Sequence, residues 1–382
     1  MEVVTLDIIN AMINCLRYAD EEKLLFIKKS TVLSKFLGDY INGGKKSYQI
    51  FMAALLKNIG HIGNYGINDE NMSPNDKKYK NYKSAEIIRV MPEIFAFQYD
   101  IADIILEIDE RVDGSGYPAG KESILLEAQI IGVVEDYIKN PDIEKMMSSG
   151  KYDIAILKEL EIIVNYDEVA VMLSNTYMLN EYFQDILAKY NVYKESIEGV
   201  EEEQFLSTVA AMIDFKHSYT AGHTKRVAAY SYAIAKEMDY TKEHLAEIRY
   251  ASYLHDIGKL GVDIGILDKP DKLTNDEFEK IKLHALYSYE ILRDSPGLKK
   301  FSFGALHHER IDGKGYPFGM TGEELPEGAK IIAVADILDA LTSNRSYRKP
   351  FTFKEAFELM ELMTETALDA KVLEAAKRCF NI

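Results

Sequence analysis

The sequence predicts an all-α protein built from two tandem helical bundle domains, an assignment that rests on three observations. Apolar residues such as Val227, Ile234 and Met238 recur at the spacing of one helix face. Gly and Pro cluster at a few expected loops, among them residues 313–317, while alternating strand-like stretches are scarce. Finally, a series of motifs in the first half of the chain recurs in the second half.

This internal repeat sets the expected domain boundaries. Four segments recur in the same order, and chance similarity between two helical segments would not give four matches in register. The expected domains are residues 1–165 and 205–382, joined by a helical linker at 166–204. The matching pairs are 53–61 with 251–259, 110–118 with 309–317, 130–133 with 331–334, and 152–157 with 368–373.

Composition restricts the expected partners and compartment. The chain has 62 acidic and 45 basic residues and a net charge of −17, so neither nucleic acid nor an anionic membrane is an expected partner. Its two cysteines, Cys15 and Cys379, lie far apart, which favours a reducing compartment over a disulfide framework. The start of the sequence lacks the basic region of a secretory signal, and apolar runs are too short to span a bilayer. We therefore expect a cytoplasmic protein.

Histidine and aspartate residues of the second copy are candidates for a metal site. His255 and Asp256 lie inside an apolar run, residues 250–257, that predicts a buried helix, and burying both is costly unless they are paired or bind a metal. The second doublet, His307-His308, is also expected on one helix, with the two rings about 100° apart around its axis. A single buried histidine is more often a hydrogen-bonded core residue, but a His-Asp doublet followed by Gly-Lys is harder to explain in that way. The complete candidate set is His223, His255, Asp256, His284, His307, His308 and Asp336.

Imidazole and carboxylate ligands without thiolates suit Fe, Mn or Zn. Seven ligands exceed what one tetrahedral ion needs, whereas two ions bridged by Asp256 would use them all. In such a site a bridging water loses its proton near neutral pH and becomes the nucleophile, while both ions hold phosphate oxygens of the substrate. Lys259 lies one turn beyond the doublet, where it could neutralise charge on the phosphoryl oxygens.

In the order and identity of these motifs, the second copy resembles the HD-GYP subfamily of HD-domain phosphohydrolases. The resemblance implies an all-helical fold, two divalent metal ions (Fe or Mn), and hydrolysis of cyclic di-GMP to the linear dinucleotide pGpG, to GMP, or to both. It also implies that the seven candidates are metal ligands, that Lys259 contacts the substrate phosphate, and that Arg345 and Arg348 hold the dinucleotide. The matching motifs are Gly222–Val227, His255–Lys259, His284, His307–Glu309, Asp312–Pro317, Asp336 and Asp339–Ser343.

One position departs from part of that subfamily. Some members carry a Glu four residues before the first histidine and bind a third metal ion. This sequence has Tyr219 there, and a phenol is a poor ligand at neutral pH. We therefore expect two metal ions rather than three.

The first copy has lost the candidate metal ligands. Lys57 and Asn58 stand where the second copy has its His-Asp doublet, so this copy is predicted to be catalytically inactive. It is either a regulatory domain, which could bind a protein partner or form a homodimer, or a duplicate that only packs against the active copy. The remaining replacements are Ile108-Asp109 for His307-His308, Glu135 for Asp336, His61 for Lys259, and Lys80 near the place of His284.

Two other functions remain open at this stage. One keeps the same chemistry but acts on another cyclic dinucleotide or on a nucleotide. The other is a signalling protein that binds cyclic di-GMP or a partner and turns over poorly. The intact set of candidate ligands favours an enzyme.

Overall fold

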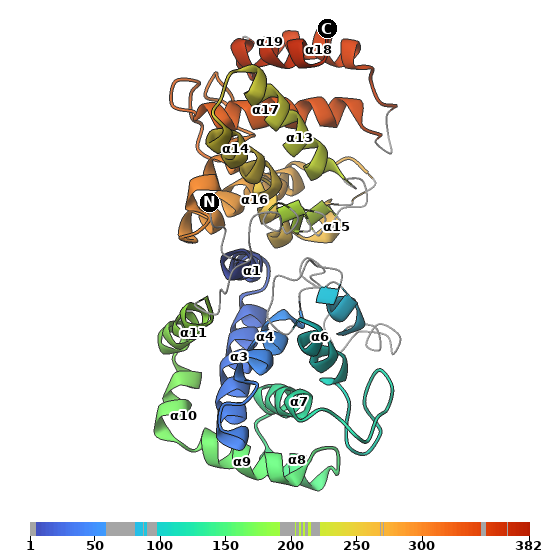
Figure 1. The fold of residues 1–382 in the computed structure, drawn as a ribbon, viewed down its shortest axis with the longest axis vertical. Coiled ribbons are helices and arrows are strands. Elements are labelled where there is room, and N and C mark those ends of the chain that lie inside the picture. Colours follow the sequence, from blue (N-terminus) through green and yellow to red (C-terminus); the bar gives the residue numbers. More distant parts are fainter. Residues whose placement is uncertain are drawn as a thin grey trace. The chain divides into compact units, whose positions relative to one another are not determined.

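The computed structural model confirms the predicted all-helical fold (Figure 1). Among the described residues no strand forms, and Asp312 and Thr321 make a single isolated bridge. No helix in this part of the chain is both long and apolar enough to cross a membrane. The structure describes residues 5–58, 81–86, 88–89, 98–191, 203, 206–207, 209–210, 213–214, 222–267, 269, 271–344, 349–364 and 366–382.

The described residues form two compact units, one around each copy. The unit that contains the second copy also includes residues 5–19, from the start of the chain. The other unit contains residues 20–58 and 81–191, with the gaps given above. The domain boundaries expected at 165 and 205 stay predictions.

The unit of the first copy is built around the long helix α3, which packs against α4, α7, α9 and α11. An aspartate caps the start of α3, because the carboxylate of Asp20 accepts a hydrogen bond from the backbone N–H of Lys23. The helices of this unit are α3 (Glu21–Asn42), α4 (Ser47–Leu56), α6 (Gln98–Glu107), α7 (Leu126–Lys139), α8 (Ile143–Ser148), α9 (Ile154–Val164), α10 (Asp167–Ser174) and α11 (Thr176–Asn191).

The unit of the second copy has the same arrangement, with α13 in the central position of α3. Helix α13 packs against α14, α17 and α19, and α16 packs against η3 and η4. The start of α16 agrees with its sequence signal, since Thr274 and Glu277 form a capping box. The helices are α1 (Thr5–Asn14), α2 (Leu16–Ala19), α13 (His223–Glu237), α14 (Lys242–Leu254), η3 (Ile257–Gly261), α15 (Ile264–Leu267), α16 (Asn275–Asp294), η4 (Lys299–Leu306), α17 (Glu327–Thr342), α18 (Phe353–Glu361) and α19 (Ala370–Cys379).

Helices α1 and α2 pack on the part of this unit that follows the His-Asp doublet. The ring of Tyr18 stacks on that of Tyr287 with centroids 4.0 Å apart, and its hydroxyl donates to Glu290 at 2.6 Å. The thiol of Cys15 lies 3.5 Å from the backbone carbonyl of Ile257, at the start of η3. Residues at the start of the sequence thus support the back of η3, which the internal repeat did not predict.

Both copies contain the same Gly-Tyr-Pro loop. In the second copy the buried carboxylate of Glu309 accepts backbone hydrogen bonds from Phe318, Gly319 and Met320 at 2.6–3.1 Å. Gly315 is required because a Cβ there would lie 2.4 Å from the backbone of Glu309. In the first copy Glu110 and Gly116 have the same roles toward the corresponding loop.

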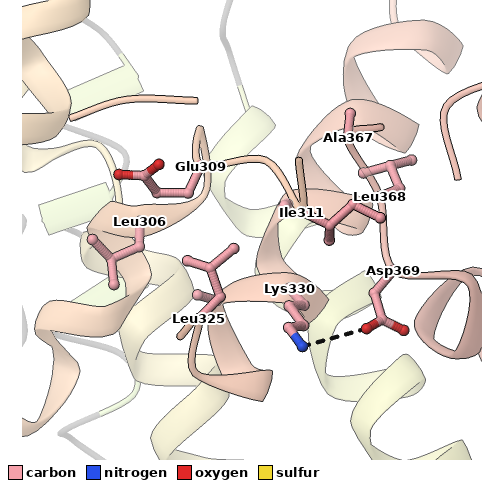
Figure 2. A pocket seen from close by; sticks show the side chains of 10 residues that line it. Leu306, Glu309, Ile311, Leu325, Lys330, Ala367, Leu368 and Asp369 are labelled. Atoms are coloured by element: carbon pink, nitrogen blue, oxygen red, sulfur yellow. Dashed lines mark ion pairs between the residues drawn. The ribbon is translucent and has the colours of Figure 1, made fainter. Parts of the chain in front are cut away.

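Behind this loop the second copy is closely packed. Leu306, Leu325 and Ala329 form a buried cluster (Figure 2). Lys330 and Asp369 pair at 3.4 Å beside it, and the cavity that remains measures about 10 Å³. That volume holds at most about one water molecule, so the loop has a rigid support rather than a ligand pocket.

Candidate metal centre

The structure brings the seven predicted residues of the second copy together from several helices. His223 is the first residue of α13, His284 lies in α16 and Asp336 in α17. Both doublets were predicted to lie within helices, and this prediction is wrong. His255 is the residue after α14 and His307 the residue after η4, because each helix ends just before its doublet.

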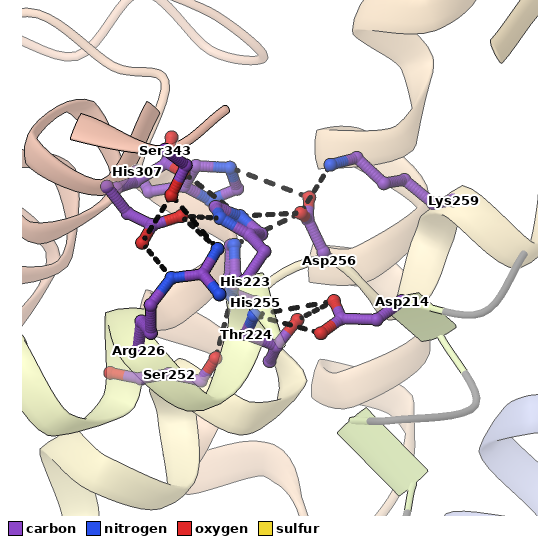
Figure 3. Close-up of polar contacts among 12 residues, drawn as sticks. Asp214, His223, Thr224, Arg226, Ser252, His255, Asp256, Lys259, His307 and Ser343 are labelled. Carbon is purple, nitrogen blue, oxygen red and sulfur yellow. Dashed lines mark hydrogen bonds and ion pairs between the residues drawn. The ribbon is translucent and has the colours of Figure 1, made fainter. Parts of the chain in front are cut away.

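Asp256 lies at the centre of the cluster and is almost completely buried (Figure 3). Its Oδ2 is 3.1 Å from Nε2 of His255 and 3.9 Å from Nε2 of His223. Its Oδ1 faces two other imidazoles, 3.3 Å from Nε2 of His284 and 3.8 Å from Nε2 of His307. The two oxygens of one carboxylate therefore face two different pairs of histidines.

Three of these histidines are oriented by the backbone. Nδ1 of His255, His284 and His307 lies 2.6–2.9 Å from the carbonyl oxygen three residues earlier in each case. A carbonyl can only accept a hydrogen bond, so Nδ1 is the donor and Nε2 is the nitrogen left for a metal. All three Nε2 atoms face Asp256, and metal-ligating histidines are commonly oriented in this way.

Burial and charge set the ionisation of the cluster. Burial, and next the nearby His284, lower the pKa of His308 to about 3, and burial with His308 lowers that of His307. Burial would raise the pKa of Asp256, but His255 and Lys259 outweigh it and hold that pKa well below its usual value. At neutral pH these groups are neutral imidazoles and a carboxylate, the forms that bind a metal.

His223 differs from its neighbours. Burial would lower its pKa, but the hydrogen bonds to Asp336 and Asp339 outweigh it and raise the pKa to about 9. Its Nε2 lies 3.2 Å from Asp336 and its Nδ1 lies 2.7 Å from Asp339. A proton on this ring occupies the position where a ligand lone pair would face a cation.

The cluster has the side chains of a metal site, and some of its buried polar atoms lack a hydrogen-bond partner. Three of its buried atoms have no hydrogen-bond partner: Nε2 of His255, Nε2 of His284 and Oδ1 of Asp256. Leaving buried polar atoms unpaired is costly, and a cation would satisfy all three. Two groups of side chains have ligand atoms within 4.8 Å of one another, namely His223, His255 and Asp256, and His284, His307 and His308. The second copy can therefore hold metal ions.

Two further side chains border the cluster. The ammonium of Lys259, in η3, pairs with Asp256. The ring of Tyr316, from the Gly-Tyr-Pro loop, stacks on His308 with centroids 4.8 Å apart. The predicted substrate contacts Arg345 and Arg348 lie outside the described residues, as do Tyr219, His61 and Lys80.

The first copy has a salt bridge at the corresponding place. Lys57 is the residue after α4, as His255 is after α14, and its ammonium pairs with Glu135 of α7. Both side chains are nearly inaccessible to solvent, at 2% and 3% exposure. A fixed positive charge thus lies beside the carboxylate that corresponds to Asp336, which agrees with the predicted loss of metal binding in this copy.

Sequence reasoning assigned no role to Asp339 or Arg226. The structure places the buried carboxylate of Asp339 between His223 and the guanidinium of Arg226. A usable signal was present, because Asp336 and Asp339 are three residues apart and must share a face of α17.

The helical fold and the buried His/Asp cluster define a class, the HD-domain proteins, and comparison with known sequences gives the same result. The sequence profile of the HD domain matches residues 29–153 and 207–372. These ranges cover most of the chain, so the protein belongs to the HD-domain family. The profile matches twice, in agreement with the predicted tandem copies.

Individual relatives act on cyclic dinucleotides according to their names. The chain is 33% identical to the 3'3'-cGAMP-specific phosphodiesterase 3 of Vibrio cholerae over 75% of its own length and 64% of that protein. It is 38% identical to a cyclic di-GMP phosphodiesterase of Thermotoga maritima over 51% of its own length and 56% of that protein. The chain therefore matches less than two thirds of the length of either relative.

A solved structure has the same fold over nearly the whole chain. The crystal structure of a cyclic GMP-AMP-specific phosphodiesterase of V. cholerae superposes with a TM-score of 0.68 and covers 99% of this chain and 97% of that one. The two sequences are 23% identical in this alignment, so the likeness concerns the fold.

Proposed function

We propose that this protein is a metal-dependent phosphodiesterase that hydrolyses a cyclic dinucleotide, with cyclic di-GMP as the leading substrate. The observation that carries the proposal is the position of Asp256, whose two oxygens face separate pairs of histidines. This arrangement supports a centre of two divalent ions, Fe or Mn, with Asp256 between them. The proposed ligands are His223, His255, Asp256, His284, His307, His308 and Asp336.

In this proposal each side chain contributes through its charge and position. Bound divalent ions would supply Lewis acidity toward the phosphodiester and lower the pKa of water for attack on phosphorus. Lys259 pairs with Asp256 in the structure and would move to the phosphoryl oxygens of a bound substrate. Attack by water on phosphorus breaks one P–O ester bond and gives a linear dinucleotide with a terminal phosphate.

Substrate binding is proposed to need local positive charge, because the chain as a whole is acidic. Lys259 and the metal ions would supply part of it. Arg345 and Arg348 follow the helix that carries Asp336 and are proposed to hold the remaining phosphate oxygens.

A specific observation favours a second substrate. The relative that matches 75% of this chain is named for 3'3'-cGAMP, which has one adenine in place of a guanine. Both rings contain the same pair of 3'–5' phosphodiesters, so the proposed centre serves either one.

Product analysis tests the function. Protein purified anaerobically and loaded with Fe or Mn is incubated separately with cyclic di-GMP and 3'3'-cGAMP, and the nucleotides are separated chromatographically. We expect a linear dinucleotide or a mononucleotide from at least one ring and neither product from His255→Ala. The matched control is Asn58→Ala, which alters the corresponding doublet of the first copy and should leave turnover unchanged. Tight binding of both rings without either product would replace the enzyme with a signalling protein that binds the dinucleotide.

A further inference from the structure

Among the candidate ligand histidines with a described Nδ1 contact, His223 alone is oriented by a side chain. His255, His284 and His307 each use the backbone carbonyl three residues earlier. His223 begins α13, so no earlier carbonyl of that helix is available to it. Its Nδ1 contacts the carboxylate of Asp339 at 2.7 Å instead.

Helix α17 supplies a carboxylate to each nitrogen of the His223 ring. Asp336 lies 3.2 Å from Nε2, and Asp339, one turn later, lies 2.7 Å from Nδ1. An acceptor at Nδ1 fixes the tautomer in which Nε2 is free to bind a metal, and a charged acceptor also makes the imidazole a stronger ligand. Asp339 thus does for His223 what the backbone does for the other three histidines.

Asp339 is itself held in place by three donors. Its side chain is 2% exposed; Oδ1 accepts from Arg226 Nε at 2.5 Å, and Oδ2 accepts from Arg226 Nη2 at 3.1 Å. The hydroxyl of Ser343 also donates to Oδ1, at 3.1 Å, and accepts from Arg226. A buried carboxylate needs such partners to remain charged, and the planar guanidinium fixes its orientation as well.

The first copy lacks this arrangement. Glu135 corresponds to Asp336, and three residues later the chain has Ile138 where the second copy has Asp339. The carboxylate is therefore present in the copy that has the histidine cluster and absent from the copy that has lost it.

We propose that Asp339 is a positioning residue that orients His223 for metal binding, and that Arg226 holds Asp339 in place. The inference rests on the metal centre of the proposed function. It assigns Asp339 to the ion bound by His223, His255 and Asp256, and not to the ion bound by His284, His307 and His308.

The test compares Mn²⁺ titrations of metal-free wild type, Asp339→Asn and Asp339→Glu, each checked for folding by circular dichroism. In Asp339→Asn we expect the Kd of one ion to rise about 10- to 100-fold, the usual effect of removing such a partner, while the second ion binds as before. Asp339→Glu should recover part of the affinity. At saturating Mn²⁺ the kcat of Asp339→Asn should return toward the wild-type value, because Asp339 touches no substrate.

The matched control is Asp369→Asn, the same chemical change at the N-cap of α19 in the same unit. It should bind both ions with wild-type affinity. If Asp339→Asn does not fold, Arg226→Gln provides the test from a half-exposed position, with an expected Kd between those of wild type and a ligand variant.

The outcomes separate the two proposals. A wild type that binds no metal overturns the proposed function. A wild type that binds two ions, with Asp339→Asn and Arg226→Gln binding both equally well, overturns the role of Asp339 alone.

Discussion

Lys57 and Glu135 form a buried ion pair in the first copy, at the positions where the second copy has His255 and Asp336. The ammonium lies where the corresponding histidine would face a cation. Because these two charges neutralise each other, we expect this copy to fold without metal.

Breaking this pair should destabilise the first copy strongly. Glu135→Gln leaves the Lys57 ammonium buried without its charged partner, which costs about 3–5 kcal/mol. Denaturant unfolding of the purified variant measures the loss. The double variant Lys57→Met/Glu135→Leu should recover most of it, and a single variant as stable as wild type would contradict the buried pair.

The metal-free centre should release a proton when it binds metal. His223 has a pKa raised to about 9, whereas His307 and His308 have lowered pKa values and are already neutral. At pH 7.5 we therefore expect binding to expel about one proton per chain, and metal affinity to rise with pH up to about 9. Calorimetric titration in buffers of different ionisation enthalpy measures this number, and a value of zero at pH 7.5 would be inconsistent with a protonated His223.

The raised pKa of His223 also affects the stability of the metal-free protein. A raised folded-state pKa means that the stabilisation by the protonated ring is complete below pH 6.5, its ordinary pKa, and is lost as the pH rises through about 9. Thermal unfolding of metal-free wild type should therefore occur at lower temperature at pH 9.5 than at pH 6. In His223→Gln the difference in unfolding temperature between the two pH values should be smaller. An equal difference in wild type and in this variant would mean that other groups cause it.

Helices α1 and α2 should stabilise the unit that contains the second copy. Tyr18 stacks on Tyr287 and donates to Glu290, so Tyr18→Ala removes an aromatic contact and a hydrogen bond, at a cost of about 2 kcal/mol. Hydrogen exchange should show weaker protection in η3 and α16. The control is Tyr177→Ala, at a highly exposed tyrosine in α11 of the other unit, which should change neither the stability nor the exchange of η3 and α16.

Tyr316 should support metal binding through its ring rather than through its hydroxyl. The ring stacks on His308, so Tyr316→Phe should keep metal affinity and turnover close to wild type. Tyr316→Ala removes the stack and should weaken Mn²⁺ binding several-fold, about 1 kcal/mol for an aromatic pair. An equal loss of Mn²⁺ affinity in Tyr316→Phe and Tyr316→Ala would show that the hydroxyl matters instead.

The sequence allowed the helical fold, the repeat and the family to be predicted, because each depends on local patterns or on residue order. The seven clustered side chains were predictable because histidine and aspartate in apolar surroundings need a partner. The contacts of Tyr18 with α16 and of Lys57 with Glu135 were not, since they join residues far apart in the chain. The ends of α14 and η4 before their doublets also escaped prediction, because no glycine or proline marks them.

The most direct test of the central claim is the metal content of protein purified anaerobically, measured by elemental analysis for wild type and Asp256→Asn. Because Asp256 faces both pairs of histidines, we predict two ions per chain in wild type and loss of both in the variant. The control variant Lys57→Ala, in the first copy, should still contain two metal ions per folded chain. One ion, three ions or none in wild type, or two ions retained by Asp256→Asn, would contradict a two-metal centre organised around Asp256.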